Sequence, residues 1–430
     1  MEGQSSDSPS KQQSLETKLI DMLQNVEPPK MYGLDMQCIY RVPTDIRETN
    51  LKAYTPRVVS IGPFHKERDA GKEDSIFESM EELKVNYLKA FLNRSQVPVG
   101  AFVDTLQALE DNIRSCYAVR IKYNSDDFLK MILIDACFII EHFLRRHKYH
   151  DWKGNDVLLK PWMLTQISDD LILLENQLPF FVLEELYKLA GMNREFPSFL
   201  EISFNYWKTE KYVKSCPIEV PKHFTDLLRT CIITSSKFDL REREGCKKIA
   251  HVYSASQLWE AGLKFKASPN EDECLLDLTY SNEGVLTMPI LNMHDIAEMY
   301  FRNIVAFEIC HLPYNTNIIS QYLAILYFLI NNEKDVNVLV DNKIIVNWMG
   351  DANKVSTMVN SLNSNLMMPE FNLHYYSICN SLNDFYESPL NKYKAIFIHE
   401  YFNTPWKIAS TVAAIVLLLL TLIQTIFSII

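Results

Sequence analysis

Apolar side chains recur at helical spacing along most of the 430-residue chain. From Ser75 they return every three or four residues, and Ser75 with Glu78 has the spacing of a capping box. Residues 102–122 repeat this pattern, and residues 128–146 are apolar nearly all round, which is typical of a helix at the centre of a core. We expect further helices at 15–23, 160–177, 293–311, 316–331, 351–362 and 380–400, from Pro179 to Gly191, and after Pro221.

Two segments depart from the helical pattern. Residues 274–280 and 285–291 flank the polar turn 281–284, which is the strongest hairpin signal in the chain. Residues 39–66 contain three prolines and one glycine, which excludes a long helix there, and Gly62-Pro63 predicts a turn. The predicted fold class is therefore mainly α: a large multi-helix soluble domain with a small β-hairpin, plus one C-terminal transmembrane helix.

The end of the chain predicts a membrane anchor. Residues 408–430 carry no charge, and at about 1.5 Å per residue they reach about 34 Å as a helix, enough to cross a bilayer core of about 30 Å. Trp406 and Lys407 mark the expected membrane boundary. Residues 128–146 are a weaker alternative span, because Lys130, Asp135 and Glu141 interrupt them. The expected domains are a polar, largely disordered N-terminus at 1–35, a helical domain at 36–400 and the anchor at 408–430.

The flanks of the predicted span indicate its orientation. Lys392, Lys394 and Lys407 precede it and no basic residue follows it, so the positive-inside rule places residues 1–407 in the cytosol. The N-terminus has no apolar signal region, which favours a tail-anchored, single-pass protein in the plasma membrane or an endomembrane. The nine cysteines are scattered and contain no C-x-x-C pair, as expected of free thiols in a reducing compartment.

Composition and motifs argue against several classes of function. The chain has 43 basic and 54 acidic residues, a net charge of −11, which argues against a nucleic-acid partner. Only 11 residues are glycine, and the chain has no nucleotide-binding glycine loop, no G-x-S-x-G and no H-E-x-x-H motif. We therefore assign no catalytic, cofactor-binding or metal-ligating residue and expect a protein that is not an enzyme.

Several polar residues nevertheless lie in apolar surroundings. Asp135 lies inside a run of apolar residues, and a second group precedes Pro179. The members of that group are Asp169, Asp170, Glu175, Asn176 and Gln177. We favour a structural interpretation, in which they bond backbone donors or basic partners. The alternative is a membrane-attached enzyme using a carboxylate pair drawn from Asp135, Asp169, Asp170 and Glu175, which would have to converge in an open pocket. We also expect Arg302-Asn303 and Glu308 to form a buried polar pair.

Five ordered segments resemble a known plant family, domain of unknown function 247. They are residues 39–66, 131–144, 169–187, 301–308 and 401–429, with the central sequences VVSIGPFH, MILIDACFII, LLENQLPFF, FRNIVAFE and YFNTPWK. Within them the motif candidates are Pro56, Gly62, Pro63, Asp135, Glu175, Asn176, Gln177 and Pro179. The chain departs from the family pattern at Ala136 and at Lys66-Glu67. The resemblance implies a plant membrane protein with a C-terminal span and without established catalytic residues; some grass members are implicated in pollen–stigma recognition.

Together these observations favour a membrane-anchored plant protein with a non-enzymatic role in protein interaction, signalling or cell recognition. Its expected partners are the lipid bilayer, through Ile408 to Ile430, and a protein of unknown identity. A lipid-surface scaffold is a further alternative, but three lysines near the span fall short of the usual basic cluster.

Overall fold

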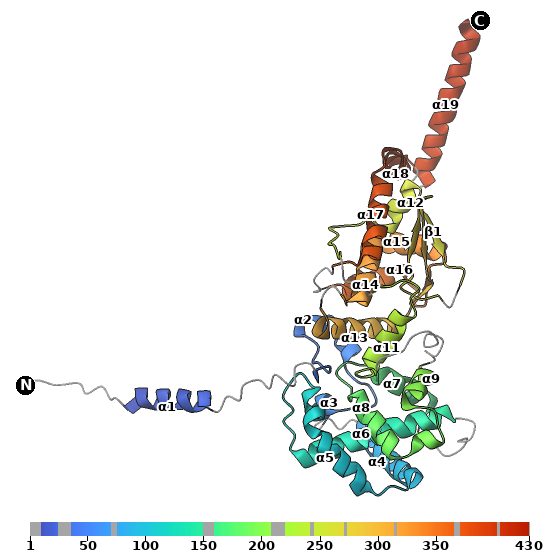
Figure 1. The fold of residues 1–430 in the computed structure, drawn as a ribbon. Coiled ribbons are helices and arrows are strands. Elements are labelled where there is room, and N and C mark those ends of the chain that lie inside the picture. The colour runs from blue at the N-terminus through green and yellow to red at the C-terminus, as the bar shows by residue number, and fades with distance from the viewer. Residues whose placement is uncertain are drawn as a thin grey trace, which may run out of the picture.

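The computed structural model describes residues 10–24, 36–69, 75–148, 159–207, 220–240, 245–270, 273–313, 316–364, 370–401 and 405–429. Most of the described body forms two helical lobes, one above the other, and a long C-terminal helix rises from the upper lobe (Figure 1). The predicted mainly α fold with one C-terminal apolar helix is confirmed. The predicted short N-terminal helix is α1 (Ser10–Gln24). The rest of the expected disordered N-terminus, residues 1–9 and 25–35, lies outside the described residues.

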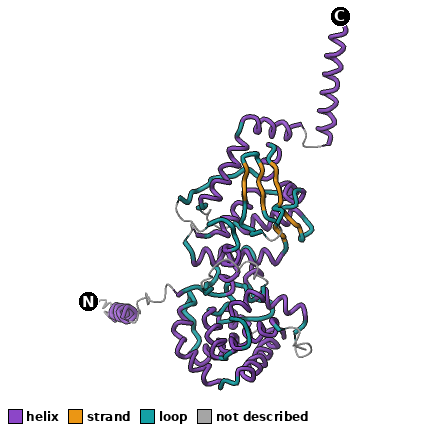
Figure 2. The backbone as a smooth tube through the Cα atoms, turned by 45° about the vertical axis from the view of Figure 1, so that its right-hand side comes forward, coloured by secondary structure: helices purple, strands orange, loops and turns teal. Residues whose placement is uncertain are grey.

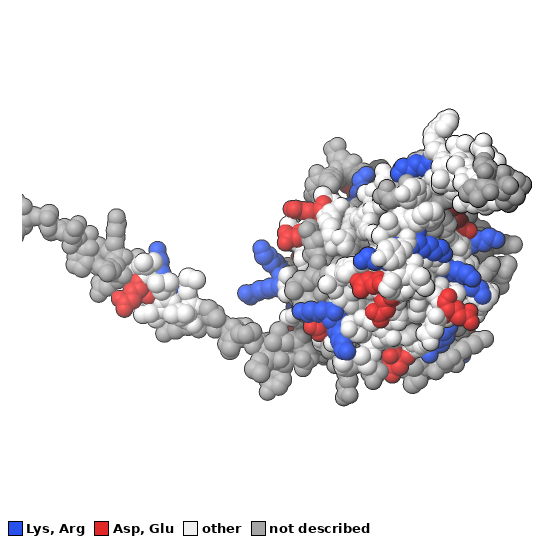
Figure 3. All heavy atoms as spheres, turned by 90° about the horizontal axis from the view of Figure 1, so that it is seen from above, with Lys and Arg blue, Asp and Glu red and all other residues white. Residues whose placement is uncertain are grey.

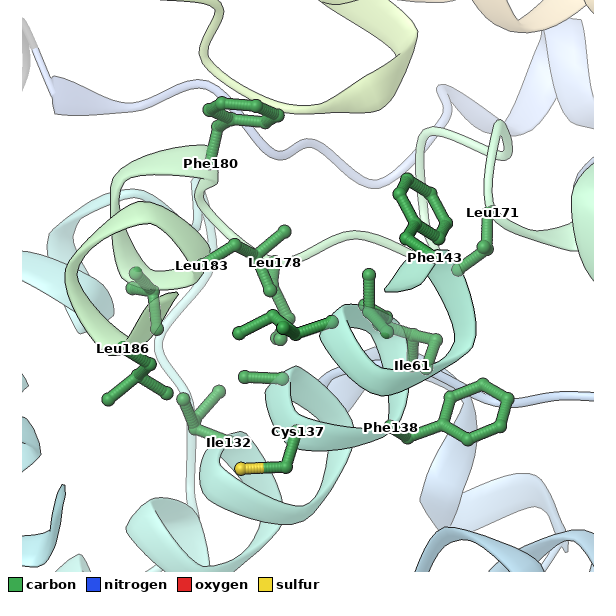
Figure 4. Packing of buried hydrophobic residues seen from close by; sticks show 14 of the residues in the cluster. Ile61, Ile132, Cys137, Phe138, Phe143, Leu171, Leu178, Phe180, Leu183 and Leu186 are labelled. Atoms are coloured by element: carbon green, nitrogen blue, oxygen red, sulfur yellow. The ribbon is translucent and has the colours of Figure 1, made fainter. Parts of the chain in front are cut away.

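The lower lobe is built around one helix, α6 (Ser125–His147). Fifteen of its side chains are buried, from Phe128 to Leu144, and it packs against α4, α5, α8 and α9. Figure 4 shows how Ile132, Cys137, Phe138 and Phe143 of α6 meet the side chains of α8 and its neighbours. The surrounding helices are α3 (Pro63–Asp69), α4 (Ser75–Ser95), α5 (Val99–Ser115), α7 (Pro161–Asp170), α8 (Phe180–Leu189) and α9 (Phe199–Tyr206). The prediction that 128–146 is a core helix is confirmed.

The upper lobe combines helices with two small sheets (Figure 2). Its helices are α12 (Ala255–Ala261), α13 (Asp295–His311), α14 (Ile318–Leu329), α15 (Glu333–Asp341), α16 (Ala352–Leu362), α17 (Leu373–Glu387) and α18 (Pro389–Tyr401). The predicted hairpin is present as β2 (Thr279–Ser281) against β3 (Val285–Met288), antiparallel with Tyr280 opposite Leu286. Two parallel pairings were not predicted: β1 (Lys264–Ala267) with β3, and β4 (Leu291–Met293) with β5 (Ile345–Asn347).

The two lobes meet at α11 (Phe224–Thr234), α13 and the segment after residue 36. That segment contains a short helix, α2 (Thr44–Arg47), and a 3-10 helix, η2 (Leu51–Tyr54). A separate apolar cluster fills this junction, with residues from the segment after residue 36, from the loop that follows α7 and from α13: Val42, Ile46, Ala53, Tyr54, Leu173, Leu174, Met299, Ala306 and Phe307. The junction therefore depends on segments that are far apart in sequence.

Three predicted helix boundaries are wrong. The helix expected at 160–177 ends at Asp170, because the next eight residues form a buried loop. The helix expected at 380–400 is two helices, α17 and α18, since Pro389 lacks the N–H that a continuous helix needs. The helix expected at 102–122 ends at Ser115.

The C-terminal helix α19 (Pro405–Ile429) differs from the other long helices in its exposure. Its segment Trp406–Ile426 is long and apolar enough to cross a membrane, and none of it is buried. Among the described residues no other helix meets both conditions. Trp406 and Lys407 lie in its first turn, where the sequence predicts the membrane boundary.

Candidate functional site

The buried polar residues of the sequence analysis lie around one stretch of extended chain, residues 56–62. Asp170 ends α7, and its carboxylate accepts the backbone N–H groups of Arg57, Val58 and Val59 at 2.7–3.0 Å. Burial raises the pKa of Asp170 to about 7, while the three backbone donors act in the opposite direction. Pro56, which is buried, precedes these donors. The carboxylate of Asp170 therefore accepts the backbone hydrogen bonds that the carbonyls of a neighbouring strand would otherwise accept.

Asn176 also binds the extended stretch through its side-chain amide, whereas the side-chain amide of Gln177 binds the loop that follows α7. The Oδ1 of Asn176 accepts the N–H of Ile61 at 2.7 Å, and its Nδ2 donates to the carbonyls of Val59 and Asp170. Gln177 Nε2 donates to the Leu171 and Leu173 carbonyls at 2.6 and 2.8 Å.

These amides explain why residues 171–178 can form a buried loop. Residues 171–174 are at most 1% exposed, so their backbone polar groups cannot reach water. The N–H of Leu174 donates to Asn303 Oδ1 at 2.9 Å, and the Ile172 carbonyl accepts from Thr225 Oγ1 at 2.8 Å. Asn303 lies on α13 and Thr225 on α11, so the loop joins both helices of the lobe junction.

Asp135 holds the other end of the extended stretch from the centre of α6. Its Oδ2 accepts the N–H of Gly62 at 2.9 Å, and its Oδ1 accepts from Lys84 Nζ at 2.9 Å. Lys84 also donates to the carbonyl of Ser60. Both charged side chains are 0% exposed. The pair therefore fixes the turn before α3 on the two main helices of the lower lobe, α4 and α6.

Glu175 binds the first part of the same segment. Its Oε1 accepts the N–H of Val42 at 2.8 Å, and its Oε2 pairs with the guanidinium of Arg47 and lies 3.7 Å from that of Arg41. His65 Nε2 lies 3.5 Å from the same oxygen. We call this whole group the polar clasp, and define it by Asp135, Asp170, Glu175, Asn176 and Gln177.

Asp169 lies at the edge of the polar clasp. Its Oδ2 accepts from Arg57 Nη2 at 2.7 Å, and the side chain of Arg57 is nearly half exposed. Burial raises the pKa of Asp169, against the effect of Arg57. This ion pair lies between the polar clasp and solvent.

The expected pair between Arg302-Asn303 and Glu308 does not form. Arg302 and Glu308 are six residues apart on α13 and face different directions. Arg302 pairs with Glu298 at 2.7 Å, and Glu308 pairs with Arg229 at 2.9 Å. Glu308 also accepts the N–H groups at the start of α14.

The geometry of the polar clasp fits the structural interpretation of these residues. Asp135, Asp170 and Glu175 are at most 2% exposed, and each accepts a backbone N–H from residues 42–62. General acid–base chemistry would need two carboxyls facing an open pocket. Among the described residues no group of three or more His, Cys, Asp or Glu side chains is arranged to hold a metal ion. What the arrangement does is tie the segment after residue 36 to both lobes.

Some members of this network were missed by the sequence analysis. Lys84 lies four residues after Met80 and three before Tyr87, so it shares a helix face with these apolar residues and with Phe91. A lysine in such an apolar row is a signal for a buried partner. Arg47 carries no comparable signal, because its segment has no regular period.

The turn at Gly62 makes one prediction about stability. Gly62 has φ +68°, and a Cβ there would lie 2.8 Å from the carbonyl oxygen of Gln177. Gly62→Ala is therefore expected to lower the free energy of unfolding by about 1–3 kcal/mol, measured by urea titration. Gly100→Ala is the matched control, since nothing lies within 4 Å of its added Cβ. Equal urea midpoints for Gly62→Ala and the wild type would contradict the described turn.

A buried histidine at the lobe junction makes a second prediction. His223 Nε2 lies 2.9 Å from the carbonyl of Cys38, and its Nδ1 accepts the N–H of Asp226. These contacts need the neutral imidazole, and burial lowers its pKa to about 4.

Since the folded-state pKa is below the unfolded value of about 6.5, the stabilising effect is complete above pH 6.5 and is lost as pH falls toward 4. The free energy of unfolding should lose up to about 3 kcal/mol through His223 in this window. His223→Gln should remove that part of the pH dependence in urea titrations at pH 7.5 and 5. If the free energy of unfolding of the variant depended on pH as strongly as that of the wild type, the role given to His223 would be refuted.

The lower lobe also has an apolar groove of about 500 Å³. It is lined by α4, α5 and α6, with Val85, Leu88, Val103, Leu106, Leu129, Leu133 and Ile134 as its apolar side chains and Gln107, Asp126 and Lys130 as its polar ones. The sequence analysis did not predict it, because each helix contributes only two to five of the lining residues.

Comparisons with known proteins agree with the resemblance noted in the sequence. The family model for domain of unknown function 247, described as a plant protein of unknown function, matches residues 39–420. The UPF0481 protein At3g47200 of Arabidopsis thaliana is 28% identical over 425 residues, which cover 91% of this chain and 86% of that protein. The putative UPF0481 protein At3g02645 of Arabidopsis thaliana is 21% identical over 489 residues, covering 90% of this chain and 89% of that protein. No solved structure matches the chain. Since the family model spans most of its length, the chain belongs to the plant family of domain of unknown function 247.

Proposed function

We propose that this protein is a single-pass, tail-anchored membrane protein whose helical body lies in the cytosol and recognises a partner protein there. The observation that carries the proposal is the exposure of Trp406–Ile426, an apolar segment of 21 residues of which none is buried. Exposing such a helix to water would be costly, and a bilayer core removes that cost.

The orientation rests on the charges beside the span. Lys392, Lys394 and Lys407 lie just before it, and the positive-inside rule assigns such a basic flank to the cytosolic side. The cysteines also favour the cytosol, because free thiols are typical of a reducing compartment. The eight cysteines that the structure describes are free thiols, six of them buried.

The body supports a binding role more than a catalytic one. The carboxylates considered for catalysis hold backbone N–H groups or basic side chains of this chain, so no specific observation favours the enzymatic alternative. A scaffold held by anionic lipids also lacks support. Seen from the α19 end, Lys and Arg are interspersed with Asp and Glu rather than gathered in one patch (Figure 3).

Proximity labelling tests the proposal, with the labelling enzyme fused to the N-terminus of three forms. The forms are the full chain, a deletion of residues 408–430, and a chain in which an unrelated membrane helix of equal length replaces them. We expect the full chain and the replacement to label a shared set of proteins that the deletion loses. Identical neighbours for the full chain and the deletion would contradict the proposal.

A further inference from the structure

The helix before the membrane anchor carries an exposed apolar stripe. On α18, Leu390, Tyr393, Phe397 and Tyr401 follow one another at spacings of three, four and four residues, so they share one face. Their side chains are 83%, 72%, 49% and 51% exposed. A stripe with three aromatic residues and one leucine is unusual on a water-facing helix.

The opposite face of α18 is fixed to the body. Ala395, which lies across the helix from the stripe, is 3% exposed, and α18 packs against α12 and α17. The direction of the stripe is therefore set by the upper lobe.

The place of α18 in the molecule indicates what covers the stripe. Both views put α18 at the outer end of the upper lobe, beside the start of α19. Figure 2 shows α18 lying crosswise to α19. Trp406, at the start of α19, is 85% exposed. Aromatic side chains next to the first turn of a membrane span are positioned at the depth of the lipid headgroups.

We propose that α18 is an interfacial helix whose stripe inserts into the surface of the bilayer that α19 crosses. This inference rests on the proposed membrane anchor and adds to it. The body is then held in a fixed orientation, with α18 at the depth of the lipid headgroups and the lower lobe farthest from the bilayer. The contact comes from buried apolar area, because Lys392 and Lys394 are too few for attraction by anionic lipids.

Site-specific photo-crosslinking of the full chain in phosphatidylcholine nanodiscs tests the inference. A benzophenone amino acid replaces Tyr393 or Phe397 in the stripe, and Leu418 in the span serves as the positive control. Lys392 is exposed on the other side of α18, and Trp162 is a half-exposed aromatic residue of the lower lobe; both are negative controls. We expect lipid adducts at Tyr393 and Phe397 several-fold above those at Lys392 and Trp162.

The controls separate the two claims. Adducts at Leu418 with only background at Tyr393 and Phe397 would overturn the interfacial helix and leave the anchor standing. Background at Leu418 as well would overturn the anchor itself. A pair of variants tests the stripe with the probe kept at position 393: Leu390→Asp should reduce the adduct there, whereas Lys392→Asp should not. Equal adducts in both variants would also overturn the inference.

Discussion

Asp135→Ala is expected to lower the free energy of unfolding by about 3–5 kcal/mol, because it takes the buried carboxylate partner away from the buried ammonium group of Lys84. Asp135 and Lys84 are both 0% exposed, and their charged atoms are 2.9 Å apart. The same change removes the acceptor of the Gly62 N–H, which is held at 2.9 Å. Urea unfolding of the full chain in detergent, followed by circular dichroism, measures the loss.

Two control variants identify the source of the effect. Glu81 also pairs with Lys84, at 2.6 Å, but its side chain is 44% exposed, so Glu81→Ala should cost less than about 1 kcal/mol. The double variant Asp135→Leu with Lys84→Met removes both charges and should be more stable than Asp135→Ala alone. A loss for Asp135→Ala no larger than that for Glu81→Ala would refute the role given to this pair.

Asp170→Ala is the second large effect, with an expected loss of about 3–6 kcal/mol. The change leaves the buried N–H groups of Val58 and Val59 without an acceptor, at about 1–3 kcal/mol each, and the part-buried N–H of Arg57 adds a smaller cost. Hydrogen exchange of these three amides should rise together with the loss of stability. Asp170→Asn keeps one carbonyl oxygen and should lose less.

Asp169→Ala is the matched control for Asp170→Ala. Its ion-pair partner is Arg57, whose side chain is 45% exposed, so water replaces the lost partner and the cost should be near 1 kcal/mol or less. Unchanged exchange at Val58 and Val59 in Asp170→Ala would contradict the description of the polar clasp.

The helices of this protein could be predicted from the sequence where their apolar pattern is strong. α6 and α13 are close to their expected ranges, because the period of apolar residues is local information. The end of α7 at Asp170 was missed, since side chains of α11 and α13 stabilise the loop that follows it. The parallel pairing of β4 with β5 was missed for a similar reason: it joins residues more than 50 positions apart.

The candidate site shows the same limit. The unusual residues could be recognised from their neighbours, because Asp135 interrupts an apolar run and Asp170 borders one. Their partners could not be predicted, because Gly62 lies 73 residues from Asp135 and Val58 lies 112 residues from Asp170. Only the fold brings these donors to the carboxylates.

Alkaline carbonate extraction, combined with protease treatment of intact cells, tests the central claim most directly. We expect the full chain to stay in the membrane pellet, the form lacking residues 408–430 to be released, and external protease to leave the body intact until the membrane is permeabilised. Release of the full chain by carbonate, or digestion of the body from outside intact cells, would contradict the cytosolic membrane anchor.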